Sequence, residues 1–306
     1  MGKITKEIKK KQIKKGNLMI VEFIKLGGCS ILIVLISKYI LANSLRNLAK
    51  AIEIKPKTIG NISGIATSIP ELLTTTISGF KGLLETSIYN ILSSNIINFI
   101  LYISSVFVNK NQKILKNKVI LIELILVSIT IFIPIILNIT KQELNIYYVF
   151  IFIGLYLFLK LIDNLVHKKY LNQSNVIENN EEKMNEKKQN EKLKLKDLKK
   201  EYKIKIITKY SLLIIFAGIL LFFIGDILSN SLEILCNNFN VSQFIIGILL
   251  GVVTSVPEFI TFFEAQKNYK NKEEGIIEAT NNLLSSNMIN LFIIQSIGIF
   301  VYNTFL

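Results

Sequence analysis

Residues 60–71 read GNISGIATSIPE, and residues 247–258 read GILLGVVTSVPE. The two stretches align without a gap and share six identities: Gly60 with Gly247, Gly64 with Gly251, Thr67 with Thr254, Ser68 with Ser255, Pro70 with Pro257 and Glu71 with Glu258. A second pair of matching stretches follows, because residues 90–98 (NILSSNIIN) and 282–290 (NLLSSNMIN) agree at seven of nine positions. Such self-similarity indicates a duplicated structural unit.

The composition around these repeats is that of a membrane protein. Hydrophobic residues make up 51% of the 306 residues, charged residues make up 19%, and the formal net charge is +14. Apolar runs of about twenty residues, each long enough to cross a bilayer as a helix, recur along the chain. This composition excludes a soluble enzyme and a nucleic-acid-binding protein as leading interpretations. The basic residues are expected in loops that face anionic lipid.

The apolar runs predict an all-α, polytopic membrane protein with about eight transmembrane helices. The predicted spans are residues 18–43, 58–80, 86–108, 118–138, 145–166, 206–235, 242–265 and 275–302. They divide the chain into a basic N-terminal tail (1–17), a first membrane half of five helices (18–166), a charged linker (167–205) and a second half of three helices (206–306). The linker is expected to be solvated, with a helical second half.

The repeat predicts how the two halves are oriented. Its copies begin in the second and the seventh predicted helix, five spans apart, so they must cross the membrane in opposite directions. An inverted repeat of this kind is typical of secondary transporters.

The distribution of basic residues predicts the topology. With the N-terminus outside, the segments on the inner side carry 23 Lys and Arg residues and the outer segments carry 9. Short loops rich in Lys and Arg stay in the cytoplasm. We therefore expect an integral protein of the plasma (inner) membrane with an external N-terminus and a cytoplasmic 167–205 loop.

The first motif predicts an oxygen-rich site inside the membrane. A carboxylate in the middle of a span opposes insertion by roughly 2.5 to 3.5 kcal/mol, so Glu71 and Glu258 need a functional explanation. Each follows a proline, which has no N–H and leaves a carbonyl four residues earlier without its helical partner. Irregular backbone at this depth is tolerated where it lines a cavity. Nearby hydroxyl groups and glycines belong to Thr67, Ser68, Thr254, Ser255, Gly64 and Gly251.

The second motif adds polar side chains at helical spacing. Ser94 and Asn98 are four residues apart and share one helix face, as do Ser286 and Asn290. Two explanations stay open, hydrogen-bonding glue between helices and ion lining, and the duplication favours ion lining. Two carboxylates with hydroxyl and carbonyl oxygens, but without His or Cys, suit hard cations such as Ca²⁺, which takes about six to eight oxygen ligands. Two negative charges match one divalent ion or two competing monovalent ions, and such competition is the basis of antiport.

These motifs resemble the cation/calcium exchanger superfamily of the sodium/calcium exchanger type, whose inverted repeats carry Gly-Thr-Ser-x-Pro-Glu and Gly-Ser-Asn-x-x-Asn/Asp. The resemblance implies that Glu71 and Glu258 ligate calcium and sodium and that Asn98 and Asn290 lie at the centre. Hydroxyl groups of six residues would line the sodium sites: Thr67, Ser68, Ser94, Thr254, Ser255 and Ser286. Gly64 and Gly251 would supply carbonyls, and the first and sixth spans would form a sliding gate.

The resemblance implies function as well. The expected activity is exchange of calcium for sodium by alternating access, without covalent chemistry and without an organic cofactor, so the chain is not expected to be an enzyme. Calcium/proton exchange is the alternative within transport. The family usually has ten spans, so a transport-inactive subunit that binds a cation or a partner is a third hypothesis. Two kinds of partner remain possible. One is a second copy of the chain, and the other is a different chain that supplies the two spans by which the eight predicted here fall short of the family's ten.

The remaining titratable residues receive ordinary explanations. Glu22, Glu123, Asp163, Glu264 and Glu278 are expected near the membrane interfaces, because they lie near the ends of spans. His167, the only histidine, is expected to be exposed beside Lys168 and Lys169. Cys29 and Cys236 lie in apolar stretches and are expected to be buried and unpaired.

Overall fold

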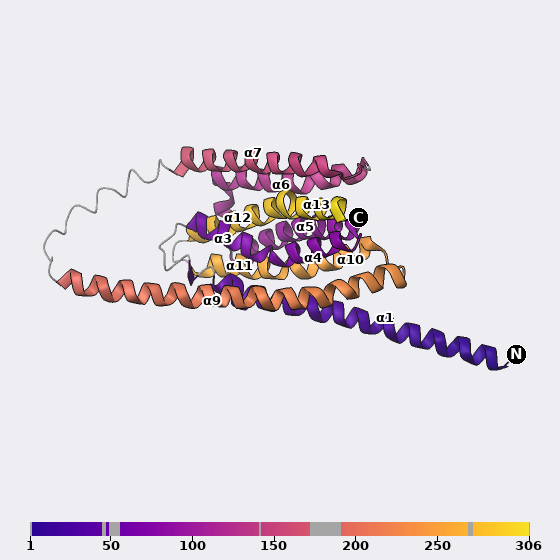
Figure 1. The fold of residues 1–306 in the computed structure, drawn as a ribbon. Helices are drawn as coiled ribbons and strands as arrows, with labels where there is room; N and C mark the ends of the chain where they lie inside the picture. Colours follow the sequence, from indigo (N-terminus) through magenta and orange to yellow (C-terminus); the bar gives the residue numbers. More distant parts are fainter. Residues whose placement is uncertain are drawn as a thin grey trace.

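The computed structural model describes residues 2–44, 47–48, 56–140, 142–171, 191–268 and 272–305, and this part of the chain consists of helices joined by short turns, without a strand (Figure 1). The elements of the first half are α1 (Gly2–Ile36), η1 (Ser37–Ala42), α3 (Pro56–Thr67), α4 (Ile69–Phe80), α5 (Leu84–Val108), η2 (Gln112–Lys116), α6 (Lys118–Ile139) and α7 (Ile146–Leu171). Those of the second half are α9 (Glu191–Glu233), η3 (Ile234–Asn238), α10 (Gln243–Thr254), α11 (Val256–Asn268), α12 (Lys272–Met288), η4 (Ile289–Ile294) and α13 (Gln295–Phe305).

The predicted all-α membrane fold is confirmed. Among the described residues, seven helices are long and apolar enough to cross a membrane: Lys15–Leu41, Leu84–Val108, Lys118–Ile139, Ile146–Lys168, Ile204–Asn238, Gln243–Lys267 and Lys272–Phe305. The remaining predicted span, 58–80, corresponds to α3 and α4, two helices of 12 residues each. This segment is rich in Gly, Ser and Thr and is therefore less apolar than the others.

Two of the predicted helices are broken at equivalent positions. Ser68 separates α3 from α4, and Ser255 separates α10 from α11. Pro70 and Pro257 follow each break by two residues, and neither can donate a hydrogen bond to the carbonyl four residues before it. The backbone of the two serines is nearly the same, with φ −82° and ψ 2° at Ser68 and φ −77° and ψ −4° at Ser255.

The two broken helices run in opposite directions. The chain passes from α3 on the left of Figure 1 to α4 on the right, whereas it passes from α10 on the right to α11 on the left. The helices that follow the broken ones are also antiparallel to each other. Helix α5 runs from right to left in Figure 1, whereas α12 continues into α13 from left to right. This arrangement is the inverted repeat that the sequence predicts.

Each repeat packs its first motif against the second motif of the other repeat. A Cβ atom added at Gly64 on α3 would lie 2.7 Å from the carbonyl oxygen of Asn282 and 2.9 Å from the backbone nitrogen of Ser286. At Gly251 on α10 it would lie 2.7 Å from the carbonyl oxygen of Asn90 and 2.9 Å from the nitrogen of Ser94. Only glycine allows these close approaches. The glycines therefore bring four helices of two repeats around one point.

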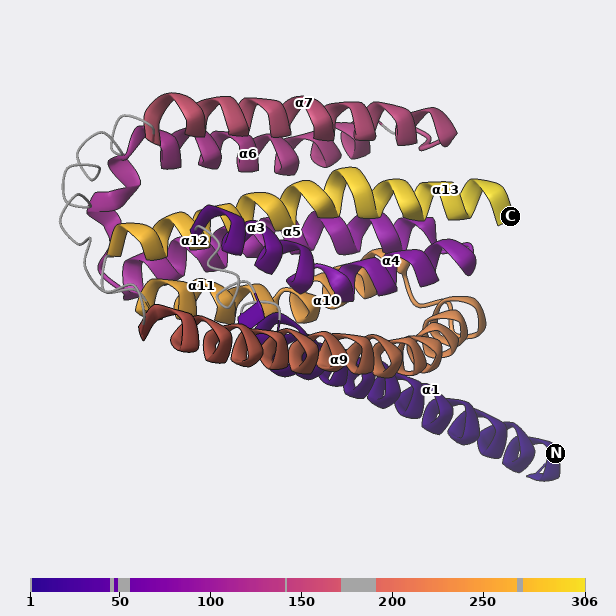
Figure 2. The ribbon, with the colours of Figure 1, turned by 60° about the vertical axis from the view of Figure 1, so that its left-hand side comes forward.

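Peripheral helices flank this central bundle on two sides (Figures 1 and 2). The hairpin of α6 and α7 covers α12 and α13, while α1 and α9 lie side by side on the opposite side. The peripheral helices carry many exposed apolar side chains, among them Ile24, Phe150, Phe158, Leu212 and Phe223. Such surfaces are suited to contact with lipid.

The ends of the helices agree with the relative topology that the sequence predicts. Both chain termini lie at the right-hand end of Figure 1, and α7 ends and α9 begins at the left-hand end. Within the charged linker, the structure leaves residues 172–190 undescribed, and α9 begins at Glu191, so the second half of the linker is helical as predicted. Helix α1 begins at Gly2, so the basic N-terminal tail predicted for residues 1–17 is helical and continuous with the first span.

Candidate functional site

The two glutamates of the repeat stand at the start of a helix that follows a break. Glu71 lies in the first turn of α4 and Glu258 in the first turn of α11, and the exposed fraction of both side chains is 0%. The N-terminal end of a helix carries a partial positive charge, which stabilises a carboxylate placed there. The break at each serine therefore places a helix end, and a carboxylate that it stabilises, inside the bundle.

Each glutamate accepts a hydrogen bond from the second motif of its own repeat. The hydroxyl of Ser94 donates to Oε1 of Glu71 at 2.8 Å, and that of Ser286 donates to Oε1 of Glu258 at 3.2 Å. In the first repeat, the turn between α4 and α5 makes this contact possible: Gly82, with φ 72°, allows α5 to fold back along α4.

The same two serines also contact the opposite repeat. Ser68 donates to Oγ of Ser286 at 3.1 Å, and Ser255 donates to Oγ of Ser94 at 3.1 Å. Four predicted site hydroxyls and two carboxylates therefore form two symmetric chains of hydrogen bonds that cross between repeats.

The asparagines of the second motif lie between the two chains. Asn98 Nδ2 donates to Ser286 Oγ at 3.3 Å, and Asn290 Nδ2 donates to Ser94 Oγ at 3.5 Å. Their neighbours Asn95 and Asn287 have a different role, because each donates at 3.1 Å to the backbone carbonyl of the other. Asn95 and Asn287 therefore hold α5 and α12 together.

Four side-chain oxygens of the predicted site residues have no hydrogen-bond donor among the described residues. They are Oε2 of Glu71, Oε2 of Glu258, Oδ1 of Asn98 and Oδ1 of Asn290, and all four side chains are 0% exposed. A buried acceptor without a donor destabilises the protein, because it has given up its hydrogen bonds to water and gained none in return. The four oxygens form two symmetry-related pairs, and this donor set suits a hard cation.

The remaining predicted residues lie at the edge of this cluster. The Thr67 hydroxyl donates to the carbonyl of Ser63 at 3.0 Å and the Thr254 hydroxyl to that of Gly251 at 3.5 Å, so each hydroxyl bonds within its own helix. The carbonyls of Gly64 and Gly251 accept hydrogen bonds from the backbone nitrogens of Ser68 and Ser255, both at 3.2 Å. The contacts of the two glycines are therefore those of helix packing, and their ligation of an ion stays a prediction.

One symmetric pair of contacts was missed by the sequence analysis. Asn90 Nδ2 donates to Thr74 Oγ1 at 2.6 Å, and Asn282 Nδ2 donates to Thr261 Oγ1 at 2.6 Å. Both threonines lie three residues after the motif glutamate, and both asparagines open the second motif. Extending the alignment by three residues would have shown the matching threonines.

The prediction that His167 is exposed was wrong, because its side chain is only 7% exposed. The carboxylates expected near the interfaces are also buried inside the protein, with exposed fractions of 2% at Glu22, 1% at Glu123, 0% at Asp163 and 1% at Glu278. Nearness to a span end in the sequence did not reveal that these residues lie on helix faces that pack against neighbours. Glu264 is exposed, and Cys29 and Cys236 are buried and free as predicted.

Fold and site together define a class: a polytopic membrane protein with inverted repeats, broken helices and a buried cluster of carboxylate, amide and hydroxyl oxygens, which is the architecture of a secondary transporter. A family model described as "Sodium/calcium exchanger protein" matches residues 24–162 and 209–304. The match covers most of the chain, so the chain belongs to the sodium/calcium exchanger family, whose transported cations are substrates. Comparison with curated proteins and with solved structures gave no significant match.

Proposed function

We propose that this family member is a secondary antiporter that exchanges calcium for sodium by alternating access, with Glu71 and Glu258 as the central ligands. The observation that supports it most is the symmetric set of four buried oxygens without donors, contributed by Glu71, Glu258, Asn98 and Asn290. Two carboxylates balance one Ca²⁺, and the same pocket can hold sodium ions in its place.

The hydroxyl groups fit the sodium half of the cycle. Ser68, Ser94, Ser255 and Ser286 surround the two carboxylates in pairs, so two equivalent sets of hydroxyl and carboxylate oxygens exist. Calcium in the middle would use both carboxylates at once, whereas two separate monovalent ions would use one each. Simultaneous occupation by both kinds of ion would place too much positive charge in a low-dielectric pocket, which is why we expect exchange and not cotransport.

The gate of the proposed cycle consists of α1 and α9. These helices pack on each other, and the apolar cluster that includes Leu26, Ile33, Leu221 and Leu228 extends to Ile246 and Leu250 of α10. The proposed site itself is built by α3, α4, α5, α10, α11, α12 and η4. A pair of helices joined to the bundle by apolar contacts can slide along it as one body, exposing the site to each side in turn.

Uptake of radioactive calcium into proteoliposomes tests this proposal. Vesicles are loaded with sodium and diluted into sodium-free buffer, and uptake is compared with that under an imposed pH gradient alone. Uptake that needs the sodium gradient supports the proposal. Uptake driven only by the pH gradient would select calcium/proton exchange, and calcium binding without driven uptake would select a transport-inactive subunit.

A further inference from the structure

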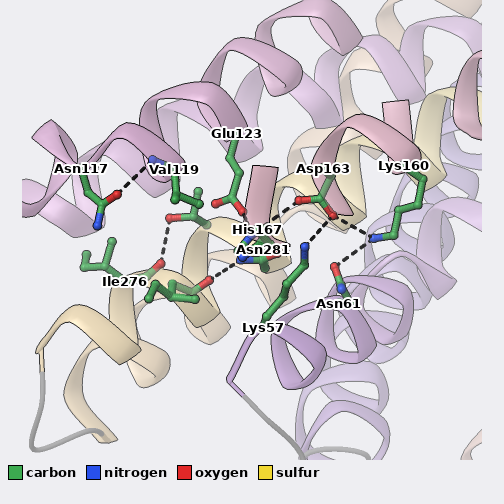
Figure 3. Close-up of polar contacts among 12 residues, drawn as sticks. Lys57, Asn61, Asn117, Val119, Glu123, Lys160, Asp163, His167, Ile276 and Asn281 are labelled. Carbon is green, nitrogen blue, oxygen red and sulfur yellow. Dashed lines mark hydrogen bonds and ion pairs between the residues drawn. The ribbon is translucent and has the colours of Figure 1, made fainter. Parts of the chain in front are cut away.

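A second buried polar cluster lies outside the oxygen site, near the C-terminal end of α7 (Figure 3). Its members are Glu123 on α6 and Asp163 and His167 on α7, all at most 7% exposed. One donor atom from each, a carboxylate oxygen or an imidazole nitrogen, lies within 4.8 Å of the other two. None of these residues belongs to the repeated motifs.

The spacing of the donors suits a small divalent ion. His167 Nε2 lies 3.5 Å from Oδ1 of Asp163. A tetrahedral ion with bonds of about 2.1 Å holds its ligand atoms about 3.4 Å apart, so this pair already has the required separation. His167 Nε2 also contacts Oε1 of Glu123 in a hydrogen bond, which must open for an ion to replace the shared proton. Three protein donors leave a fourth position for water.

Two atoms of the cluster have no partner within the described part of the chain. They are Oε2 of Glu123 and Nδ1 of His167. A buried carboxylate oxygen and a buried imidazole nitrogen that lack partners destabilise the folded state, because they have lost their hydrogen bonds to water. A further group that binds both atoms would remove this penalty. The hydrogen bond between Glu123 and His167 therefore does not fully satisfy either side chain.

The charges of the cluster are balanced from its edge. Lys57 of α3 lies 3.0 Å from Oδ2 of Asp163, and Lys160 lies 3.6 Å from the same oxygen. The lysine side chains are 18% and 28% exposed, whereas those of the two carboxylates are at most 1% exposed. Two negative charges therefore lie inside, and their positive partners reach in from the periphery. Because a lysine can extend its charged end toward water, it can give way to a cation between the carboxylates.

We propose that Glu123, Asp163 and His167 form a binding site for a divalent transition ion of the Zn²⁺, Co²⁺ or Mn²⁺ class. An imidazole with two carboxylates prefers such ions over Na⁺ or Ca²⁺, for which the oxygen site of the repeats is suited, so the cluster is not a second transport site. Binding would neutralise both carboxylates and release Lys57 from Asp163. Lys57 lies in the first turn of α3, the helix that leads to Thr67 and Ser68, so an ion here can influence the proposed transport site from a distance.

Co²⁺ is the probe for this site, because its visible absorption reports its ligands. The full chain is purified with an affinity tag that lacks histidine and is titrated with Co²⁺ in saturating Ca²⁺. His167 is the only histidine, so an imidazole contribution to the spectrum can come only from it. We expect one Co²⁺ per chain, displaced by Zn²⁺, and a loss of affinity of about 100-fold or more in His167→Gln and Glu123→Gln. Glu85→Gln, an exposed carboxylate on α5, is the matched control and should bind as the unchanged chain does.

Lys57→Gln separates an ion site from a network of ion pairs. If Lys57 and the ion compete for Asp163, removing its charge should raise Co²⁺ affinity by about tenfold, a result that a misfolded variant would not give. Absence of stoichiometric Co²⁺ binding, binding that is unchanged in His167→Gln, or weaker binding in Lys57→Gln would each overturn the proposal. The assay measures binding and does not depend on calcium transport.

Discussion

The hydroxyl oxygens of Ser68 and Ser286 are 3.1 Å apart, although the residues lie 218 positions apart in the chain. Ser255 and Ser94 make the equivalent contact from the other side, also at 3.1 Å. Because Ser286 and Ser94 each donate to a buried glutamate, both repeats contribute to the surroundings of each carboxylate. The cluster is therefore a product of the pairing of the repeats, and neither repeat contains it alone.

The first prediction concerns the two carboxylates. Glu71→Gln and Glu258→Gln should each reduce sodium-driven calcium uptake below detection, because one remaining carboxylate leaves a divalent ion with uncompensated charge in a buried pocket. Uptake by proteoliposomes measures this directly. Glu264→Gln changes an exposed glutamate on the same helix as Glu258 and should leave uptake unchanged. Near-normal uptake in Glu258→Gln would contradict the proposal that both glutamates bind the ion.

Adjacent serines give the second prediction. Ser94 and Ser286 donate to the glutamates, whereas Ser93 and Ser285 bond to backbone carbonyls, at 2.6 Å to Tyr89 and 3.2 Å to Asn61. A hydrogen bond to a charged group contributes about 1.5 to 3 kcal/mol, so Ser94→Ala and Ser286→Ala should weaken calcium binding by roughly ten- to a hundredfold.

Ser93→Ala and Ser285→Ala provide the matched controls, measured by calcium titration of the purified chain. They should change calcium affinity by less than about threefold, because each removes a bond of about 1 kcal/mol or less that does not reach the site. Equal effects at neighbouring serines would contradict the assignment.

The third prediction tests the crosswise packing. Gly64→Ala would place a methyl group 2.7 Å from the carbonyl oxygen of Asn282, and Gly251→Ala would do the same at Asn90. Overpacking of this kind lowers the free energy of unfolding by about 1 to 3 kcal/mol. Gly154→Ala on α7 is the control, because nothing lies within 4 Å of its added Cβ. The fraction of chain that stays monodisperse on size exclusion after heating should fall for the first two variants only.

The repeated motifs allowed much of the site to be predicted, because identical polar residues at equal spacing in apolar spans have few explanations other than a shared site. Glu71 and Glu258, with the hydroxyls of Ser94 and Ser286, lie together as the duplication indicates. Periodicity does not reveal which helix a glycine faces, so the contact of Gly64 with the other repeat could not be predicted. His167 was misjudged for the same reason, since the lysines that follow it suggested exposure, while its ring turns inward to Glu123 and Asp163.

The fourth prediction concerns absolute orientation. In a Cys29→Ser, Cys236→Ser background, an impermeant thiol reagent applied to intact cells should label Asn145→Cys and not Ser174→Cys. Asn145 is exposed in the turn between α6 and α7, and the excess of basic residues predicts that the 167–205 loop is cytoplasmic. Ser174→Cys should react after the cells are permeabilised. Labelling of Ser174→Cys in intact cells would reverse the topology.

The last prediction tests the sliding gate through Lys81 and Glu233. Lys81, directly after α4, forms a 2.6 Å ion pair with Glu233 at the end of α9, so the pair joins the bundle to one of the two proposed gate helices. If α9 moves past α4 in each cycle, this contact must break and re-form. Both side chains are partly exposed, so the ion pair itself contributes little stability and does not oppose the movement strongly.

A covalent link at the same place should oppose it completely. Joining the cysteines of a Lys81→Cys, Glu233→Cys variant with a short bifunctional thiol reagent, in a Cys29→Ser, Cys236→Ser background, should stop sodium-driven calcium uptake while calcium binding persists. Each single-cysteine variant treated with the same reagent should keep its uptake, which separates the effect of the link from that of modification. If the linked protein transports calcium at the rate of the unlinked one, α9 does not slide past α4, and the alternation of access must come from another pair of helices.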